Sequence, residues 1–260
     1  MKTAVITGGA GGLGRALTQA LVAKGWHVAV LDLPGPDLDR TASASVTAYP
    51  CDLTDADAVT SVCRRLCAER ASIDLVVYNA GITQIGLFAE TPLAAHRRVF
   101  EVNYFGAIHV AAALLEPVRQ SRGVHLAISS VAGFAPLYRR SAYSASKHAL
   151  EGFFRTLREE EGEFGVDVLI AAPSFVATNI GAPQEREGGI ARPGSAPDGI
   201  DYMDPAVAAK IILDGVERRR AFIPVGRVAR LAALINRLSP GLYARLMMRN
   251  MRKGRAQSRG

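Results

Sequence analysis

The sequence TAVITGGAGGLGRAL, residues 3–17, joins a short apolar run to a glycine cluster and then to a helical pattern. The apolar run predicts a buried strand, and the glycines permit a sharp turn after it. Such a turn brings the free N–H groups and the positive dipole end of the next helix close to an anion. The spacing is TGxxxGxG, not the commoner GxGxxG fingerprint, so this stretch alone indicates a phosphate cradle with a flexible turn as the alternative.

Six more short apolar runs follow, with room for a helix between most of them, at 27–32, 46–49, 73–78, 124–129, 166–172 and 221–225. Most are apolar at consecutive positions, which is typical of strands covered by helices on both faces. We therefore expect one α/β domain with a doubly wound, mainly parallel, seven-stranded sheet over residues 1–225. The segment 181–204 is rich in Gly, Pro and charge and predicts a surface loop; with the residues just before it, about 174–204, it forms a lid-like substrate loop. Pro205–Arg219 reads as a further helix.

The charge is concentrated at the C-terminal end. Residues 1–216 carry 19 basic and 23 acidic side chains, whereas residues 217–260 carry 12 basic and 1 acidic, within an overall net charge of +7. We expect residues 226–260 to form a basic amphipathic extension, with two helices over 227–253 separated by Pro240 and Gly241. The extension could pack on the protein, lie on an anionic membrane surface or meet an acidic partner. No nucleic-acid recognition module accompanies the basic residues, which argues against a nucleic-acid partner.

The cysteines and the apolar segments bound the compartment. Cys51, Cys63 and Cys67 are odd in number and lack paired spacing, which favours reduced thiols in the cytoplasm and no metal site. No run of eighteen uncharged apolar residues appears, so a membrane-spanning helix is not expected.

A carboxylate ends the second predicted strand. Asp32 could accept hydrogen bonds from the adenosine ribose hydroxyls of a dinucleotide and would repel a 2′-phosphate. Leu33 and Gly11, at two places where an arginine could receive that phosphate, are not basic. NAD is therefore preferred over NADP, with a plain strand-end cap as the alternative role of Asp32.

A tyrosine and a lysine lie four residues apart in YSASK, residues 143–147, and so share one face of a helix. The ammonium of Lys147 would stabilise the phenolate of Tyr143 and lower its pKa, which suits an acid/base for a carbonyl or an alcohol. Ser130, at the end of the fifth predicted strand, could hydrogen-bond the same substrate oxygen. Taken singly, the tyrosine and lysine could equally be surface residues.

Further markers accompany these motifs. They are CDL at 51–53, NAG at 79–81, VNYFG at 102–106, a thirteen-residue interval from Ser130 to Tyr143, and PSFVAT at 173–178. Together with the glycine turn, they make the chain resemble the short-chain dehydrogenase/reductase family over residues 1–225. Two positions depart from the family pattern: Tyr78 stands where an asparagine is usual, and Ser174 where a glycine is usual.

The resemblance implies a Rossmann-type fold and a catalytic tetrad of Asn103, Ser130, Tyr143 and Lys147. In that scheme, Asn103 holds a water in a proton relay from Lys147, which also binds the nicotinamide ribose. Asp52 contacts the adenine, Asn79 lies along the cofactor, and Val176 and Thr178 hold the carboxamide. The full set of implied cofactor contacts is Gly8, Gly11, Gly12, Leu13, Gly14, Asp32, Asp52, Leu53, Asn79, Ala80, Gly81, Tyr143, Lys147, Pro173, Val176 and Thr178.

The resemblance also places the substrate among the loops Thr83–Phe88, Phe134–Tyr138 and 174–203. Their apolar residues Ile85, Leu87, Phe88, Phe134, Leu137 and Tyr138 predict a pocket for a lipid-, aromatic- or steroid-like alcohol or ketone, with ordinary core residues as the alternative. Arg139 and Arg140 could meet an acidic group, although we expect them to be solvated. A homodimer or homotetramer is implied. The competing functions are a 3-oxoacyl thioester reductase of fatty-acid type and a catalytically silent dinucleotide-sensing protein.

Overall fold

A seven-stranded parallel sheet forms the centre of the computed structural model, which describes residues 1–178, 189–193 and 202–246. The strand order is β3-β2-β1-β4-β6-β7-β9, and every neighbouring pair is parallel. The strands are β1 (Thr3–Thr7), β2 (His27–Asp32), β3 (Val46–Pro50), β4 (Leu75–Tyr78), β6 (Val124–Ile128), β7 (Asp167–Pro173) and β9 (Phe222–Val225). The predicted doubly wound sheet is confirmed.

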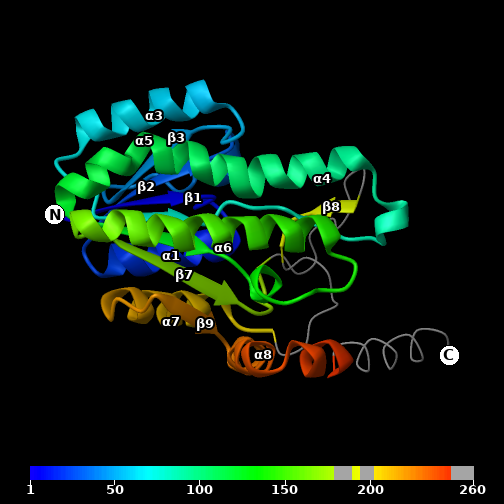
Figure 1. Cartoon of the computed structure of the whole chain (residues 1–260). Coiled ribbons are helices and arrows are strands. Elements are labelled where there is room, and N and C mark those ends of the chain that lie inside the picture. The colour runs from blue at the N-terminus through cyan, green and yellow to red at the C-terminus, as the bar shows by residue number, and fades with distance from the viewer. Residues whose placement is uncertain (179–188, 194–201, 247–260) are drawn as a thin grey trace.

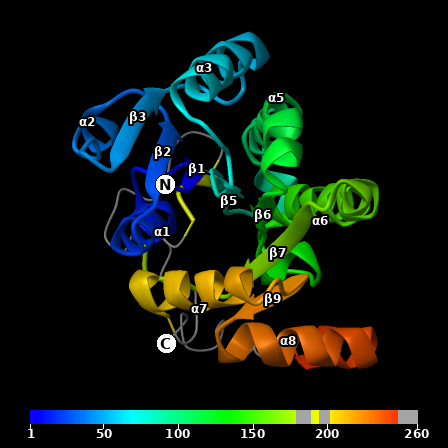
Figure 2. The ribbon, with the colours of Figure 1, turned by 90° about the vertical axis from the view of Figure 1, so that its left-hand side faces the viewer.

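Helices cover both faces of this sheet (Figures 1 and 2). One layer holds α1 (Gly12–Ala23) and α7 (Pro205–Glu217), and the other holds α3 (Ala56–Glu69), α5 (Gly106–Ser121) and α6 (Ser141–Glu161). Alternate strand residues face the two layers, so the core divides into two clusters, one around Leu17, Val30 and Leu126 and one around Leu31, Leu114 and Phe154. The strands are thus buried on both sides, as their unbroken apolar runs predict.

The order of the strands reverses between β1 and β4, and this point positions the site. From β1 the chain winds outward to β2 and β3, then crosses back to β4 on the other side of β1. In an open α/β sheet, ligands bind beyond the carboxyl ends of the strands at such a switch point. The glycine turn after β1 and the residues after β4 meet there.

A long helical stretch continues from α4 (Leu93–Phe100) through a π-helical turn, η2 (Glu101–Phe105), into α5. Among the described residues, Leu93–Ser121 is the one stretch long and apolar enough to cross a membrane by length and composition alone. Val110, Leu114 and Val118 along it are fully buried, so this side of the helix packs in the core.

Short strands and short helices complete the described fold. The strand β5 (Thr83–Gln84) pairs antiparallel with β8 (Ile190–Ala191), and the latter lies inside the predicted lid-like loop. The rest of that loop at 179–188 and 194–201 lies outside the described residues. The other short elements are α2 (Pro36–Asp39), η1 (Phe88–Glu90), η3 (Val131–Gly133) and η4 (Gly162–Phe164).

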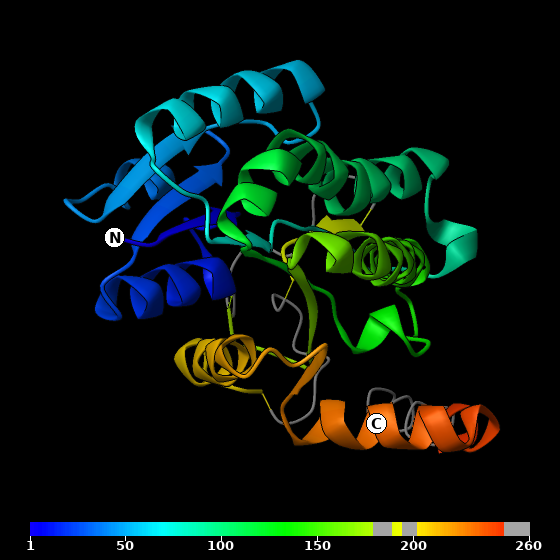
Figure 3. The ribbon, with the colours of Figure 1, turned by 60° about the vertical axis from the view of Figure 1, so that its left-hand side comes forward.

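The helix α8 (Arg227–Leu238) lies beside β9 at the outer end of the sheet (Figure 3). It buries Ala229 and Ala232, and Ala232 shares a small cluster with Ala135 and Tyr243. The second predicted tail helix is present over residues 240–246, and the remainder to 253 lies outside the described residues. The break falls at Ser239, not at Pro240 and Gly241, because a proline fits the first turn of a helix, where its missing N–H costs nothing.

Candidate active site

The glycine turn after β1 is packed too tightly for side chains at two positions. A Cβ on Gly14 would lie 2.0 Å from the carbonyl oxygen of Gly8, and a Cβ on Gly8 would lie 2.9 Å from the Cα of Ala80. Gly8 and Gly12 also have positive φ, at 65° and 51°. The turn therefore needs glycine at Gly8 and Gly14 for its shape.

The residues after β4 hold this turn in place. The amide of Asn79 donates to the carbonyl oxygens of Thr7 (3.1 Å) and Gly8 (3.0 Å), and the hydroxyl of Thr7 accepts from the backbone N–H groups of Asn79 (3.0 Å) and Ala80 (3.1 Å). The resemblance implies that Asn79 lies along a cofactor; the structure also makes it the brace of the glycine turn. Gly81 follows, beside Asn103.

The first turn of α1 is open to an anion. Its N-cap, Gly11, makes no side-chain capping bond, the first turn has no acidic residue, and a Cβ on Gly11 would meet only the guanidinium of Arg192, at 3.9 Å. The first N–H groups of a helix attract phosphate when no side chain occupies them. Gly11, Gly12, Leu13 and Gly14 thus fit the pyrophosphate of a dinucleotide.

Asp32, the last residue of β2, holds the glycine turn by a hydrogen bond. Its carboxylate accepts from the backbone N–H groups of Ala10 (3.0 Å) and Leu33 (2.9 Å) and is partly exposed. These bonds are those of a strand-end cap. Close by, three arginines gather on Asp37: Arg40 at 2.7 Å, Arg15 at 3.6 Å and Arg192 at 3.9 Å.

Asp52 and Leu53 follow β3 along the same edge. Asp52 accepts from the backbone N–H (3.0 Å) and the hydroxyl (2.8 Å) of Thr54, and these hydrogen bonds hold the pKa of its carboxyl below the usual value. The side chain of Leu53 is buried, and its carbonyl oxygen lies 2.9 Å from Nδ1 of His109. The side chain of Leu53 therefore packs in the core, next to Asp52 in the chain.

Tyr143 lies on the first turn of α6, and its side chain is only 9% exposed. Burial raises the pKa of its phenol, while a hydrogen bond with the Ser130 hydroxyl and the charge of Arg140 lower it. Ser130 itself caps η3, accepting from the backbone N–H of Ala132 at 3.2 Å. The structure thus brings the predicted serine and tyrosine together, but the prediction that this phenol has a lowered pKa is wrong, because burial outweighs the groups that lower it.

Lys147 follows one turn later and is buried, and its Nζ donates to the carbonyl oxygen of Ile128 at 2.8 Å. Nζ lies 5.8 Å from the centre of the Tyr143 ring. Burial lowers the pKa of Lys147 to about 8, against the charge of Glu151, which raises it. The ammonium is therefore near the phenol and titrates close to neutral pH.

Asn103 comes from the π-helical turn η2 and is buried. Its Oδ1 accepts from the N–H of Ile82 at 2.8 Å, and its Nδ2 donates to the carbonyl of Ile82 and to the hydroxyl of Ser146, both at 2.9 Å. A Cβ on Gly81 would lie 3.2 Å from Oδ1 of Asn103 and 3.7 Å from Nζ of Lys147. Such π turns are frequent at functional sites, and this one places Asn103 next to the lysine.

Beyond β7, Pro173 ends the strand, and Val176 forms an isolated bridge with Met203. The hydroxyl of Thr178 donates to the carbonyl of Pro193 at 2.9 Å. The hydroxyl of Ser174, one of the two departures from the family pattern, is buried with no partner among the described residues. The other departure, Tyr78, is buried, and its hydroxyl lies 2.7 Å from Nδ1 of His125. It belongs to the core cluster around Leu31, Leu114 and Phe154.

Two apolar residues of the expected substrate loops make separate contacts. Phe134 packs beside α8 and meets Phe222 edge to face, and Phe88 is exposed against His96. An open hollow of about 340 Å³ near Ile85 is also lined by Glu90 and Arg139. Arg139 is exposed as expected, but the expectation that Arg140 is solvated is wrong, because Arg140 is buried at the start of α6.

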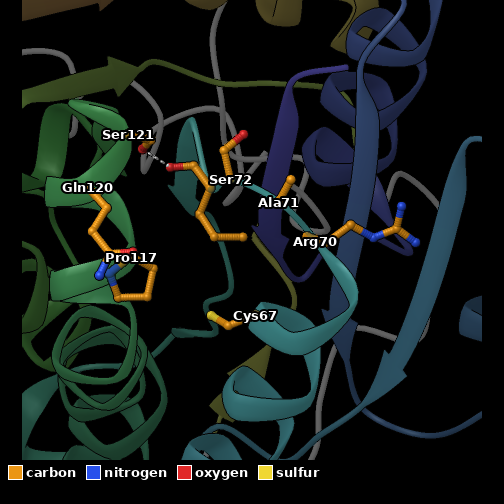
Figure 4. Close-up of a pocket in the computed structure, with 8 residues that line it drawn as sticks. Cys67, Arg70, Ala71, Ser72, Pro117, Gln120 and Ser121 are labelled. Atoms are coloured by element: carbon orange, nitrogen blue, oxygen red, sulfur yellow. Dashed lines mark hydrogen bonds between the residues drawn. The ribbon is translucent and has the colours of Figure 1, made fainter.

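A second hollow, of about 170 Å³, lies at the opposite, amino-terminal edge of the sheet (Figure 4). Its lining includes Cys67, Ser72 and Ser121, and the Arg70 guanidinium points away from it. Burial raises the pKa of the Cys67 thiol, so this thiol is not an activated nucleophile. Among residues 1–178, 189–193 and 202–246, no three His, Cys, Asp or Glu side chains gather as metal ligands.

Three supporting residues of the site were not predicted from the sequence. Gln84 is fully buried and accepts from the N–H of Ala142, at the start of α6, at 3.4 Å. Ser146 links Asn103 to the carbonyl of Tyr143. Glu151 is buried one turn beyond Lys147, and this four-residue spacing on the helix face is the signal that could have found it.

Comparison with known proteins identifies the family. The family model described as short chain dehydrogenase matches residues 2–188. The chain is 30% identical to Dehydrogenase/reductase SDR family member 7B of Xenopus laevis, over 98% of this chain and 83% of that protein. A short-chain dehydrogenase from Streptomyces avermitilis has 27% identity and a TM-score of 0.75, covering 98% and 94% of the two chains. A short-chain dehydrogenase from Burkholderia cenocepacia in complex with NADP shares the fold, with a TM-score of 0.82 at 22% identity over 94% and 97%.

The chain therefore belongs to the short-chain dehydrogenase/reductase family. It is an oxidoreductase with an NAD(P)-binding Rossmann fold.

Proposed function

We propose that the protein is an NAD(H)-dependent oxidoreductase that interconverts a secondary alcohol and a ketone, with Tyr143 as the general acid/base. The observation that carries this proposal is the buried phenol of Tyr143, hydrogen-bonded to Ser130 and one helical turn from the buried ammonium of Lys147. These groups follow β6, on the carboxyl edge of the sheet where the glycine turn also lies.

The dinucleotide supplies hydride transfer when it is bound. In ketone reduction, Tyr143 donates its phenolic proton to the carbonyl oxygen, and burial favours this protonated donor by raising the pKa of the phenol. Ser130 holds the same oxygen by a hydrogen bond. In the oxidation direction, the positive charge of Arg140 favours the phenolate that takes the alcohol proton. The Lys147 ammonium lies 5.8 Å from the centre of the same ring. Asn103, beside Lys147, completes the proposed relay.

The proposed preference for NAD over NADP rests on Asp32. An adenosine ribose bound at the end of β2 would meet this carboxylate, which would repel a 2′-phosphate. Comparing NADH and NADPH as reductants tests this directly, and Asp32→Ser should narrow the difference between them. A native preference for NADPH would contradict the proposal and would point instead to the arginines around Asp37 as phosphate ligands.

The proposed substrate is a hydrophobic alcohol or ketone, which the apolar members of the loops around Ile85 and Leu137 support. The main alternative is a 3-oxoacyl thioester. A panel of aliphatic, aromatic and steroid-like alcohols and ketones, with an acetoacetyl thioester beside them, followed at the nicotinamide absorbance, tests the two classes. Turnover of the thioester alone, with NADPH, would overturn the proposed class. A protein that binds NADH and turns over nothing would support the silent dinucleotide sensor.

The proposed setting is the cytoplasm, as a homodimer or homotetramer. Burial raises the pKa of the Cys51 and Cys63 thiols, which is consistent with structural, reduced cysteines. Light scattering of the purified chain measures the oligomeric state. The division into a catalytic domain at 1–225 and an extension at 226–260 remains part of this proposal.

We further propose that α8 makes peripheral contact with anionic membranes. The side chains of Leu231, Leu234 and Leu238 are 58%, 56% and 75% exposed, and their spacing places them on one side of the helix. By the same spacing, the leucines lie opposite the buried Ala229 and Ala232, and Arg230 and Arg237 lie on one flank between these two faces. An exposed apolar face flanked by arginines suits a helix lying in a lipid interface.

Charge favours a bilayer over a second copy of this chain as the occupant. Residues 217–246 carry seven arginines and one acidic residue, so two such surfaces facing each other would repel. Sedimentation with vesicles of phosphatidylcholine and phosphatidylglycerol should pull down the protein, whereas phosphatidylcholine alone should not. The double variant Leu234→Ser with Leu238→Ser should lose this binding, and Leu93→Ser, at an equally exposed leucine on α4, should keep it. If both variants sediment equally with the vesicles that contain phosphatidylglycerol, the proposed membrane contact through α8 is wrong.

A further inference from the structure

A buried carboxylate lies next to the catalytic residues and outside the tetrad. Glu151 is 3% exposed and lies one turn after Lys147 on α6. Its Oε1 accepts from the hydroxyl of Ser129 at 2.8 Å, and its Oε2 accepts from Arg155 at 2.8 Å. Both oxygens are therefore partnered, which is the condition under which a protein retains a buried anion.

The partner Ser129 connects this carboxylate to the end of β6. Ser129 immediately precedes Ser130, and its N–H donates to the carbonyl of Ala171 in β7 at 2.8 Å. The hydrogen bond from its hydroxyl to Glu151 therefore ties the strand end that carries Ser130 to the helix that carries Tyr143. These two residues must keep a fixed separation to share one substrate oxygen.

The turn after Ser130 closes directly onto this pair. A Cβ on Gly133, the last residue of η3, would lie 2.1 Å from Oγ of Ser129 and 2.5 Å from Oε1 of Glu151. Only glycine lets the turn approach so closely. The contact shows that Ser129 and Glu151 form a packed support beneath the turn that Ser130 caps.

Charge gives Glu151 a second effect, on Lys147. The polar and charged groups around that ammonium come from three elements: Tyr143 and Glu151 from α6, Asn103 from η2 and the Ile128 carbonyl from β6. Among the described residues, Glu151 is the anion that raises the pKa of Lys147 against burial. Glu151 is itself faced by Arg155 and Ser129.

We propose that Glu151 is a positioning residue of the active site: its carboxylate counterbalances the buried Lys147 ammonium and, through Ser129, fixes Ser130 relative to Tyr143. This inference rests on the proposed function for its kinetic consequence, but its electrostatic consequence does not depend on any substrate.

The test of the charge effect follows Lys147 directly. The chain has five lysines, at 2, 24, 147, 210 and 253, so protein labelled with ¹³C at lysine Cε gives few signals, and a Lys147→Met variant identifies the one from Lys147. Glu151→Gln keeps the size and an acceptor oxygen but removes the charge. Its Lys147 signal should titrate about one pH unit lower than in the wild type. Glu160→Gln, at an exposed carboxylate on the same helix, should leave the titration unchanged.

The kinetic test separates the two effects of Glu151. In Glu151→Gln, the basic limb of the pH profile for ketone reduction should shift to lower pH by the same amount as the Lys147 titration. Ser129→Ala keeps the charge and loses the hydrogen bond, so it should lower kcat by about tenfold at every pH, with little change in KM for NADH. Thermal melting of each variant confirms that it is folded.

The outcomes are decisive in either direction. An unchanged Lys147 titration in folded Glu151→Gln overturns the charge effect, and an unchanged kcat in Ser129→Ala overturns the positioning effect. A shifted titration in a protein that turns over no substrate would support the electrostatic inference while contradicting the proposed function.

Discussion

The close packing of the glycine turn allows the effect of one added methyl group to be predicted. In Gly14→Ala, the added Cβ would lie 2.0 Å from the Gly8 carbonyl oxygen and 2.7 Å from Nδ2 of Asn79. Both are fixed, since Nδ2 of Asn79 is itself bonded to the carbonyls of Thr7 and Gly8. The start of α1 must therefore move by more than 1 Å to restore ordinary contact, at a cost of roughly 1–3 kcal/mol.

That shift displaces the helix N–H groups expected to hold the pyrophosphate. If the same 1–3 kcal/mol falls on the bound state, the affinity for NADH drops by about 5- to 160-fold. Gly162→Ala is the matched control, because its Cβ would meet nothing within 4 Å and its φ of −58° suits alanine. Calorimetric titration with NADH, with a thermal melt to verify folding, measures the difference. A folded Gly14→Ala protein that binds NADH as tightly as Gly162→Ala would refute the cradle.

Two further predictions concern stability. Thr7→Val removes the acceptor for the N–H groups of Asn79 and Ala80 and should lower the free energy of unfolding by about 1–3 kcal/mol in urea titrations, whereas Thr60→Val, exposed on α3, should have little effect. Burial lowers the pKa of His125 to about 4, below its value of about 6.5 in the unfolded chain, so the unfolded chain takes up this proton first and stability is lost as pH falls from about 6.5 towards 4. The loss is up to about 3 kcal/mol, and it should be largely absent in His125→Gln; equal losses in both proteins would contradict this assignment.

The sheet could be predicted from the sequence because its strands carry unbroken apolar runs. The predicted β1 and β2 match the observed bounds, and the other strands differ by one or two residues at their ends. The tail differed at Ser239, because a proline was read as the helix break when it begins the next helix. β5 and β8 had no sequence signal, since they are two-residue strands paired across more than a hundred residues.

The site could be predicted to the extent that its residues form short motifs. In the family pattern, the interval to Tyr143 selects Ser130 rather than Ser129, and the structure brings Ser130 and Tyr143 together. The pattern could not reveal that burial raises the pKa of Tyr143, because desolvation depends on the whole fold. Nor could it show that Arg140 is buried or that Ser129 meets Glu151, since these contacts join separate elements.

The most direct test of the central claim is single-turnover reduction by Tyr143→Phe, with NADH and the best ketone from the substrate panel. The substitution removes one hydroxyl and leaves the ring, so NADH affinity and the thermal midpoint should stay close to those of the wild type. The rate of NADH oxidation should fall by about 10²- to 10⁴-fold, while Tyr49→Phe, which loses the hydroxyl bonded to Glu69, should keep the wild-type rate. A Tyr143→Phe protein that reduces the ketone at the wild-type rate would show that the proton comes from another group.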